Sequence, residues 1–298
     1  MKSRLDAATL ALLVVCCASW GLNQTAVKVT LAGVGPASQL AIRSAVATLL
    51  VLAWCRLRGI RLFERDGTLR PGLLVGAAFG IEFVLLFAGL QFTTASRSAI
   101  LLYLGPFHVA VGAHLWLGER LDGGRIAGLA VAFAGVVLVF STGGATAGPD
   151  HLLGDAFSVL ASIAWAACTL TIKRTALAAA PAEKTLLYQL AVSAVIGLAV
   201  ALVLGEPAPT LPTPVVGWSL VYQGVWISAV TYVIWFQLVR THPAGLLSAA
   251  TFMTPVFGVV GAVLLLGEPA SWRLAGAVAL VAVGIHLVNR PRRIVPAA

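Results

Sequence analysis

Apolar runs separated by short polar gaps divide the whole chain into helix-sized pieces. About 20 apolar residues, rising about 1.5 Å each, cross a hydrocarbon core about 30 Å thick. Runs of this length predict spans near residues 7–27, 37–56, 71–92, 97–117 and 124–141, and again near 153–173, 184–205, 215–239, 245–266 and 273–289. The pattern predicts an all-α membrane protein with ten transmembrane helices.

The composition supports the same class. Of 298 residues, 59% are apolar and 10% are charged, which is far from the usage of soluble domains and excludes a large water-soluble domain. The run 7–27 follows Lys2 and Arg4 and resembles a signal peptide, but it is long for one and no persuasive cleavage site follows it. We therefore expect it to be the first span.

The net charge of +9 reflects topology, because the basic residues lie in gaps between apolar runs and form no wettable nucleic-acid-binding face. Loops rich in Lys and Arg remain in the cytoplasm. With both termini cytoplasmic, only Lys28, Arg97 and Arg273 fall at outer ends, and Arg43 falls within a span. The opposite orientation would invert this bias, so a multi-pass protein with both ends inside is expected.

An internal repeat is visible. A constant shift places residues 99–119 on residues 248–268, pairing Pro106 with Pro255 and the sequence Leu-Gly-Glu at 117–119 with the same sequence at 266–268. A slightly smaller shift pairs Trp20 with Trp165. We expect two halves, residues 1–145 and 146–298, of five spans each. Because five is odd, the halves must be inverted, an arrangement that places a binding site near the bilayer midplane in a central cavity and allows alternating access.

At these positions the chain resembles the drug/metabolite transporter superfamily, and within it the EamA-type bacterial exporters. The resemblance covers essentially the whole chain and rests on the sequences Trp20-Gly21-Leu22-Asn23, Pro106 to Arg120, and Pro255 to Glu268. It departs where Pro269 follows Glu268 in place of Arg. The resemblance implies location in the bacterial inner membrane and efflux of small metabolites, closest to the exporters of aromatic and neutral amino acids.

The sequence leaves three functions open. The first is a secondary transporter that exports amino acids or related metabolites; the second is a multidrug carrier for cationic compounds; the third is a membrane enzyme or accessory subunit. No HExxH, GxSxG or Walker-type motif and no catalytic carboxylate pair in a loop is present, so we expect no enzyme. The expected partners are a small-molecule substrate and the lipid bilayer, without nucleic acid, and a monomer is compatible with the sequence.

Ionisable side chains in the hydrocarbon are costly and mark functional candidates. Glu82 lies near the middle of its predicted span. It could bind a substrate ammonium or exchange a proton, or it could form a structural ion pair with Arg43, which lies at similar depth. His108, in the middle of the fourth span, could relay protons or could pack against a neighbouring helix.

Further candidates are aromatic or polar. Phe79, Tyr103 and Trp165 lie near mid-membrane and Trp20 slightly outward, and Trp165 is the best candidate for stacking on a substrate. Asn23 could bond to substrate or across helices. The predicted substrate-binding set is thus Trp20, Asn23, Phe79, Glu82, Tyr103, His108 and Trp165.

Backbone features complete the predictions. Pro106 and Pro255 could act as hinges or as static bends. Glycines 72, 76 and 80 form a small-residue ridge that suits close helix packing. The four cysteines read as packing residues, and no metal or cofactor is expected.

Overall fold

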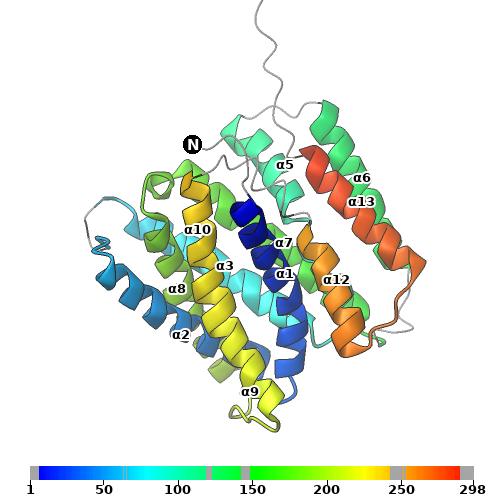
Figure 1. The fold of residues 1–298 in the computed structure, drawn as a ribbon, viewed down its shortest axis with the longest axis horizontal. Helices are drawn as coiled ribbons and strands as arrows, with labels where there is room; N and C mark the ends of the chain where they lie inside the picture. Colours follow the sequence, from blue (N-terminus) through cyan, green and yellow to red (C-terminus); the bar gives the residue numbers. More distant parts are fainter. Residues whose placement is uncertain are drawn as a thin grey trace, which may run out of the picture.

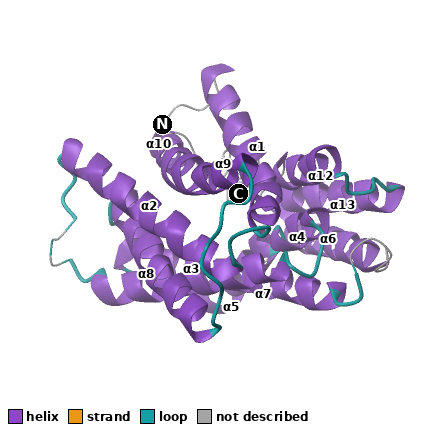
Figure 2. Ribbon diagram, turned by 90° about the horizontal axis from the view of Figure 1, so that it is seen from below, coloured by secondary structure: helices purple, strands orange, loops and turns teal. Residues whose placement is uncertain are grey.

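The computed structural model describes residues 7–62, 64, 66–118, 123–141, 148–241, 251 and 253–288, and within these ranges every regular element is a helix (Figures 1 and 2). The first six helices are α1 (Ala7–Thr30), α2 (Pro36–Leu57), α3 (Leu69–Gly89), α4 (Ala95–Leu102), α5 (Gly105–Leu117) and α6 (Gly123–Ser141). The later ones are α7 (His151–Arg174), η1 (Ala176–Ala178), α8 (Ala182–Val203), α9 (Pro214–Val221), η2 (Tyr222–Thr231), α10 (Tyr232–Thr241), α12 (Met253–Leu266) and α13 (Trp272–Val288).

Six helices in the described ranges are long and apolar enough to cross a membrane. They are α1, α2, α3, α7, α8 and the segment Ala95–Leu117 that contains α4 and α5. Shorter apolar helices occupy the predicted fifth, ninth and tenth spans. The predicted ninth span, residues 245–266, lies partly outside the described residues. The all-helical class is therefore confirmed, and the number of ten spans stays a prediction.

Helices from early in the chain pack mainly against helices from late in the chain. The main partners are α1 with α12, α2 with α8, α3 with both α7 and α8, and α6 with α13. The α6–α13 pair runs side by side along one edge of the molecule (Figure 1). The chain therefore forms one interleaved bundle, in which neither half has a separate core.

The glycine ridge of α3 lies against α8, as the sequence indicated. A Cβ atom built on Gly76 would lie 2.6 Å from the carbonyl oxygen of Tyr188 and 2.6 Å from Cβ of Val192. Gly72 and Gly80 meet α8 in the same way one turn to either side. Only glycine allows backbones to approach this closely.

Two irregularities interrupt the helices. Between α4 and α5 the helix breaks at Tyr103 and Leu104, so that Pro106 is the second residue of α5, where a missing N–H costs little. The predicted kink at Pro106 is therefore a break that precedes the proline. Pro255 lies in the first turn of α12. The second irregularity is η2, a π-helical stretch between α9 and α10.

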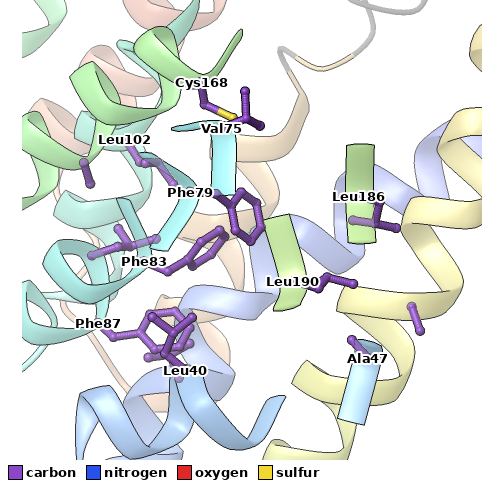
Figure 3. Close-up of a cluster of buried hydrophobic side chains, with 14 of the residues drawn as sticks. Leu40, Ala47, Val75, Phe79, Phe83, Phe87, Leu102, Cys168, Leu186 and Leu190 are labelled. Atoms are coloured by element: carbon purple, nitrogen blue, oxygen red, sulfur yellow. The ribbon is translucent and has the colours of Figure 1, made fainter. Parts of the chain in front are cut away.

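A column of aromatic side chains forms the core of the α3 contact region. Phe79, Phe83 and Phe87 follow one another along α3 at a spacing of four residues (Figure 3). Their neighbouring ring centroids are 4.7 and 5.6 Å apart. Leu40 of α2 and Leu190 of α8 belong to the same buried cluster. This column sets the surroundings of the two charged residues described next.

Candidate functional site

Glu82 lies in the interior of α3, beside the phenylalanine column, and is 6% exposed. Its carboxylate has no hydrogen bond or ion pair among the described residues. It is close enough to Arg43, Tyr103 and Tyr232 to interact with them electrostatically. Three helices besides α3 therefore contribute polar side chains around one buried acid.

Arg43 of α2 is 1% exposed. Its guanidinium carbon lies 4.0 Å from the centroid of the Phe83 ring and 5.1 Å from that of Phe87. None of its three side-chain nitrogens has a hydrogen-bond partner in the described part of the chain. Arg43 also borders an apolar cavity of about 350 Å³ between α2 and the helices α9 and η2.

The predicted ion pair between Arg43 and Glu82 is not formed in this structure. The guanidinium stacks on Phe83 and Phe87, and neither residue donates to or accepts from the other. Cation–π contacts contribute up to about 2 kcal/mol. Desolvating a charged side chain costs several kcal/mol, roughly, unless hydrogen bonds replace those to water. The stacking alone therefore leaves a buried cation that lacks the partners it needs.

Two predicted aromatic candidates lie together. Tyr103, at the end of α4, meets Trp165 of α7 edge to face, with ring centroids 5.5 Å apart. Trp165 also covers Gly105, where a Cβ atom would lie 2.4 Å from the indole ring. Tyr103 is also within electrostatic range of Glu82.

Other predicted candidates have partners of their own. The indole of Trp20 donates to the Thr231 hydroxyl at 2.9 Å, and its ring lies 5.3 Å from that of Trp235. His108 shares a 3.1 Å hydrogen bond with Ser162 of α7. Both side chains are therefore tied to a neighbouring helix.

The last two candidates differ from each other. The buried Oδ1 atom of Asn23 lacks a hydrogen-bond partner among the described residues, so that Asn23 has an acceptor to offer. Phe79 is 4% exposed and packs within the α3 core. The structure thus links Glu82 electrostatically with Arg43 and Tyr103, sets Trp165 against Tyr103, and packs Phe79 against Phe83.

Sequence reasoning missed three neighbours of the charged residues: Phe83, Phe87 and Tyr232. The two phenylalanines could have been found, because with Phe79 they form an i, i+4, i+8 row on the helix that carries Glu82. Tyr232 follows η2, and no sequence pattern marks where that irregular stretch ends.

A second buried charge cluster lies where α4 and α7 begin. Arg97 and Asp155, with side chains 3% and 0% exposed, form a salt bridge. Arg97 also donates to the carbonyl of Val139 at 2.8 Å, and Thr93 donates to Asp155 at 2.7 Å. Unlike Arg43, this arginine has a full set of partners. It joins an early helix to a late one.

Two glutamates cap the starts of helices at the same end of the bundle. Glu206 accepts from the backbone N–H groups of Ala37 and Ser38 at 2.9 and 2.8 Å. Glu268 accepts from those of Ala95 and Ser96 at 2.7 and 3.0 Å. Carboxylates satisfy the free N–H groups of a helix start and complement its dipole. Glu268 thus acts on α4; Glu119, its partner in the repeat, lies outside the described residues.

At the opposite end of the bundle, a salt bridge joins α8 to the loop before α3. Lys184 at the start of α8 donates to Asp66 at 2.8 Å, and the Thr68 hydroxyl donates to the same carboxylate. The hydrogen bond from Lys184, followed by those from Thr68, holds the pKa of Asp66 well below its usual range. The tie therefore persists at neutral pH and is lost only as pH falls through that lowered pKa.

Among the described residues, no group of three or more His, Cys, Asp or Glu side chains could hold a metal ion. Cys16, Cys17, Cys55 and Cys168 are buried and form no disulfide bond.

Apolar helices of membrane-spanning length around buried polar side chains define a multi-pass membrane protein. The sequence matches the EamA-like transporter family twice, over residues 7–141 and 152–290. The chain belongs to this family, and so to the drug/metabolite transporter superfamily.

Individual relatives agree with this assignment. A Bacillus subtilis protein named uncharacterized transporter YvbV is 26% identical over 280 residues, covering 91% of this chain and 88% of that protein. A Salmonella typhimurium protein named probable amino-acid metabolite efflux pump is 27% identical over 290 residues, 93% of each chain. A solved crystal structure of a protein with 20% identity superposes with a TM-score of 0.68, covering 95% of this chain and 96% of that one, and shows the same fold.

Proposed function

We propose that this protein exports amino acids or related small metabolites across the bacterial inner membrane. In this proposal ten helices form two inverted halves, residues 1–145 and 146–298, with both termini in the cytoplasm. Rocking of the halves exposes the buried site to each side in turn.

Glu82 is the observation that carries the proposal. A buried carboxylate that has no hydrogen bond among the described residues is costly within an apolar helix of a membrane protein. An ammonium group of a solute would supply a partner. Tyr103, which interacts electrostatically with Glu82, and Trp165 against it offer aromatic surface for the rest of the solute.

The relatives and the charge distribution support the direction and the solute class. One relative is named a probable amino-acid metabolite efflux pump. The two family matches have similar lengths, which agrees with a repeat of five helices. The scarcity of Lys and Arg at the predicted outer ends supports the orientation.

Counterflow in proteoliposomes tests the proposal. Purified protein is reconstituted and loaded with amino acids, amines or nucleosides, and uptake of labelled solute is followed. We expect saturable exchange of amino acids and its abolition in Glu82→Gln, because an amide lacks the negative charge that forms an ion pair with an ammonium. Glu64→Gln is the matched control, since the Glu64 side chain is exposed and its carboxylate lies 3.3 Å from Arg61.

The outcomes separate the alternatives. Exchange restricted to cationic dyes would favour the multidrug carrier. Unchanged exchange in a folded Glu82→Gln protein would remove Glu82 from the mechanism. A pH gradient that leaves the exchange rate unaltered would count against proton coupling.

A further inference from the structure

Arg43 is the buried cation that the proposed mechanism leaves unused. It lies on α2 with its guanidinium over Phe83 and Phe87, and all three of its side-chain nitrogens lack a hydrogen-bond partner in the described ranges. Arg97, the other buried arginine, shows what a satisfied guanidinium looks like in this bundle, with bonds to Asp155 and Val139. A structural role would have given Arg43 comparable partners.

The packing around Arg43 directs its side chain towards α3. Gly224 of η2 lies against the Arg43 backbone, where a Cβ atom would be 3.4 Å from Cα of Arg43. The neighbouring residue on α2, Ser44, bonds to Ser193 of α8 at 3.0 Å. The guanidinium is thus held on the side of α2 that also interacts with Glu82 and Tyr232.

The chemistry of a guanidinium selects its ligand. Its planar set of N–H donors matches a carboxylate, which can accept two parallel hydrogen bonds. Glu82, within electrostatic reach, cannot serve as that ligand in this structure because it makes no bond to Arg43. No described residue supplies the acceptor that the guanidinium lacks, so a bound solute is the group that would complete it.

We infer that Arg43 binds the carboxylate of the transported solute while Glu82 binds its ammonium group. The inference rests on the proposed function and narrows it to zwitterions that carry both groups, such as α-amino acids. Arg43 and Glu82 interact electrostatically but form no hydrogen bond or ion pair with each other, so each side chain can bind one end of a zwitterion. A purely cationic compound would gain from Glu82 but would be repelled by Arg43, so the pair discriminates against cationic drugs.

Matched solutes test the carboxylate directly. L-Phenylalanine, L-phenylalaninamide and phenethylamine share a side chain and an amine and differ only at the carboxylate; L-leucine, L-leucinamide and isoamylamine form a second series. Exchange in proteoliposomes and thermal stabilisation of the purified protein are measured with each. We expect the wild type to prefer an acid over its amide and amine by roughly tenfold or more.

Variants assign that preference to Arg43. Arg43→Gln should abolish the preference for the acid while the amine is handled at least as well as before, because its repulsion by Arg43 is removed; Arg43→Lys should retain part of the preference. Arg58→Gln is the control, because Arg58 also stacks on an aromatic ring, 4.6 Å from the Trp54 centroid, but is exposed. Arg43→Met should fold and melt at a higher temperature without solute, since it removes an unpartnered buried charge.

The result that overturns the inference is equal loss of acid, amide and amine in Arg43→Gln, or a wild type indifferent to the carboxylate in both series. Measuring binding and exchange separately distinguishes failure of the carboxylate site from failure of the proposed transport function. Arg43-dependent binding of the acid without exchange would contradict transport and leave the carboxylate site standing. Exchange at equal rates with and without a carboxylate on the solute would support transport and contradict a carboxylate-binding role for Arg43.

Discussion

Two buried arginines in this protein have opposite surroundings. Arg97 bonds to Asp155 and to a backbone carbonyl, whereas Arg43 stacks on two rings and has no hydrogen-bond partner in the described residues. A paired buried charge holds helices together, whereas a buried charge without a partner is costly. The distribution of acceptors therefore separates a structural arginine, Arg97, from Arg43, for which we propose a binding role.

The Arg97–Asp155 pair leads to a stability prediction. Asp155→Asn leaves the Arg97 charge buried without its counterion, so we expect a loss of about 3–5 kcal/mol in the free energy of unfolding. The apparent melting temperature in detergent is the measurement. Replacing both residues, with Arg97→Met and Asp155→Leu, should recover most of the loss, because no unpaired charge remains.

The control for this prediction is the exposed pair Arg61–Glu64, whose side chains are 85% and 56% exposed. Glu64→Gln should change stability by less than about 1 kcal/mol. An Asp155→Asn protein as stable as this control would show that the buried pair contributes nothing to folding.

How far the sequence predicts the site depends on the residue. Intramembrane charge alone pointed to Glu82 and Arg43, because apolar surroundings make any ion conspicuous. Of the two relations that the sequence left open for them, the direct ion pair is not formed in this structure, because equal depth does not say which way each side chain points. Asp155 was missed although it lies inside a predicted span, at the same outer level as Arg97. Pairing across helices requires knowledge of helix rotation, which hydropathy does not contain.

At the scale of elements, the α3–α8 contact depends on glycine. Gly76 faces the backbone of α8, so that even one methyl group would force the helices apart. Gly217 on α9 differs, because a Cβ atom there would meet only Cδ1 of Leu211 at 3.8 Å, an ordinary contact distance. Replacing each of these glycines with alanine therefore compares a tightly packed position with an open one.

We expect Gly76→Ala to destabilise the protein by about 1–3 kcal/mol. Gly217→Ala should be neutral or stabilising by up to about 1 kcal/mol, because alanine favours helix over glycine. Thermal unfolding of both variants is the measurement. If the two alanines had equal effects, the tight α3–α8 approach would have no energetic importance.

Element prediction succeeded where hydropathy is uniform and failed where helices are irregular. Long apolar runs located α1, α2, α3, α7 and α8 within a few residues. The break between α4 and α5 was expected as a kink at Pro106, but the chain breaks at Tyr103 and Leu104 and places the proline in the first helical turn. The π-helical η2 was not predicted, because one extra residue per turn leaves an apolar run unchanged.

At the scale of the molecule, one bundle end is closed by ties between early and late segments. Glu206 and Glu268, both late in the chain, cap α2 and α4. Thr210 donates its N–H to the Gly33 carbonyl at 2.8 Å, and Arg97 joins Asp155. In the orientation that the positive-inside pattern predicts, this is the outer end, so the proposed opening towards the outside would separate these bonds.

Weakening one tie should loosen that end. Ser96 is 1% exposed beneath the Glu268 carboxylate, so Ser96→Cys reports on opening. In this background Glu268→Gln should raise the rate of labelling by an impermeant maleimide about fivefold, equivalent to about 1 kcal/mol for a weakened hydrogen bond. The native cysteines are buried, and Glu64→Gln again provides the control. Equal labelling rates in all three proteins would contradict a gating role for Glu268.

The helices of residues 7–141 have their main packing partners in residues 152–290, and each stretch supplies charges that the other needs. A polypeptide cut in the connection between them would give two fragments with exposed seams. The first fragment would carry Arg97 without its counterion and the starts of α2 and α4 without their caps. The second would carry Asp155, Glu206 and Glu268 without the groups they bind. Such fragments would be stable only as an obligate heterodimer. Joining them in one chain ensures that every molecule contains both parts in equal number.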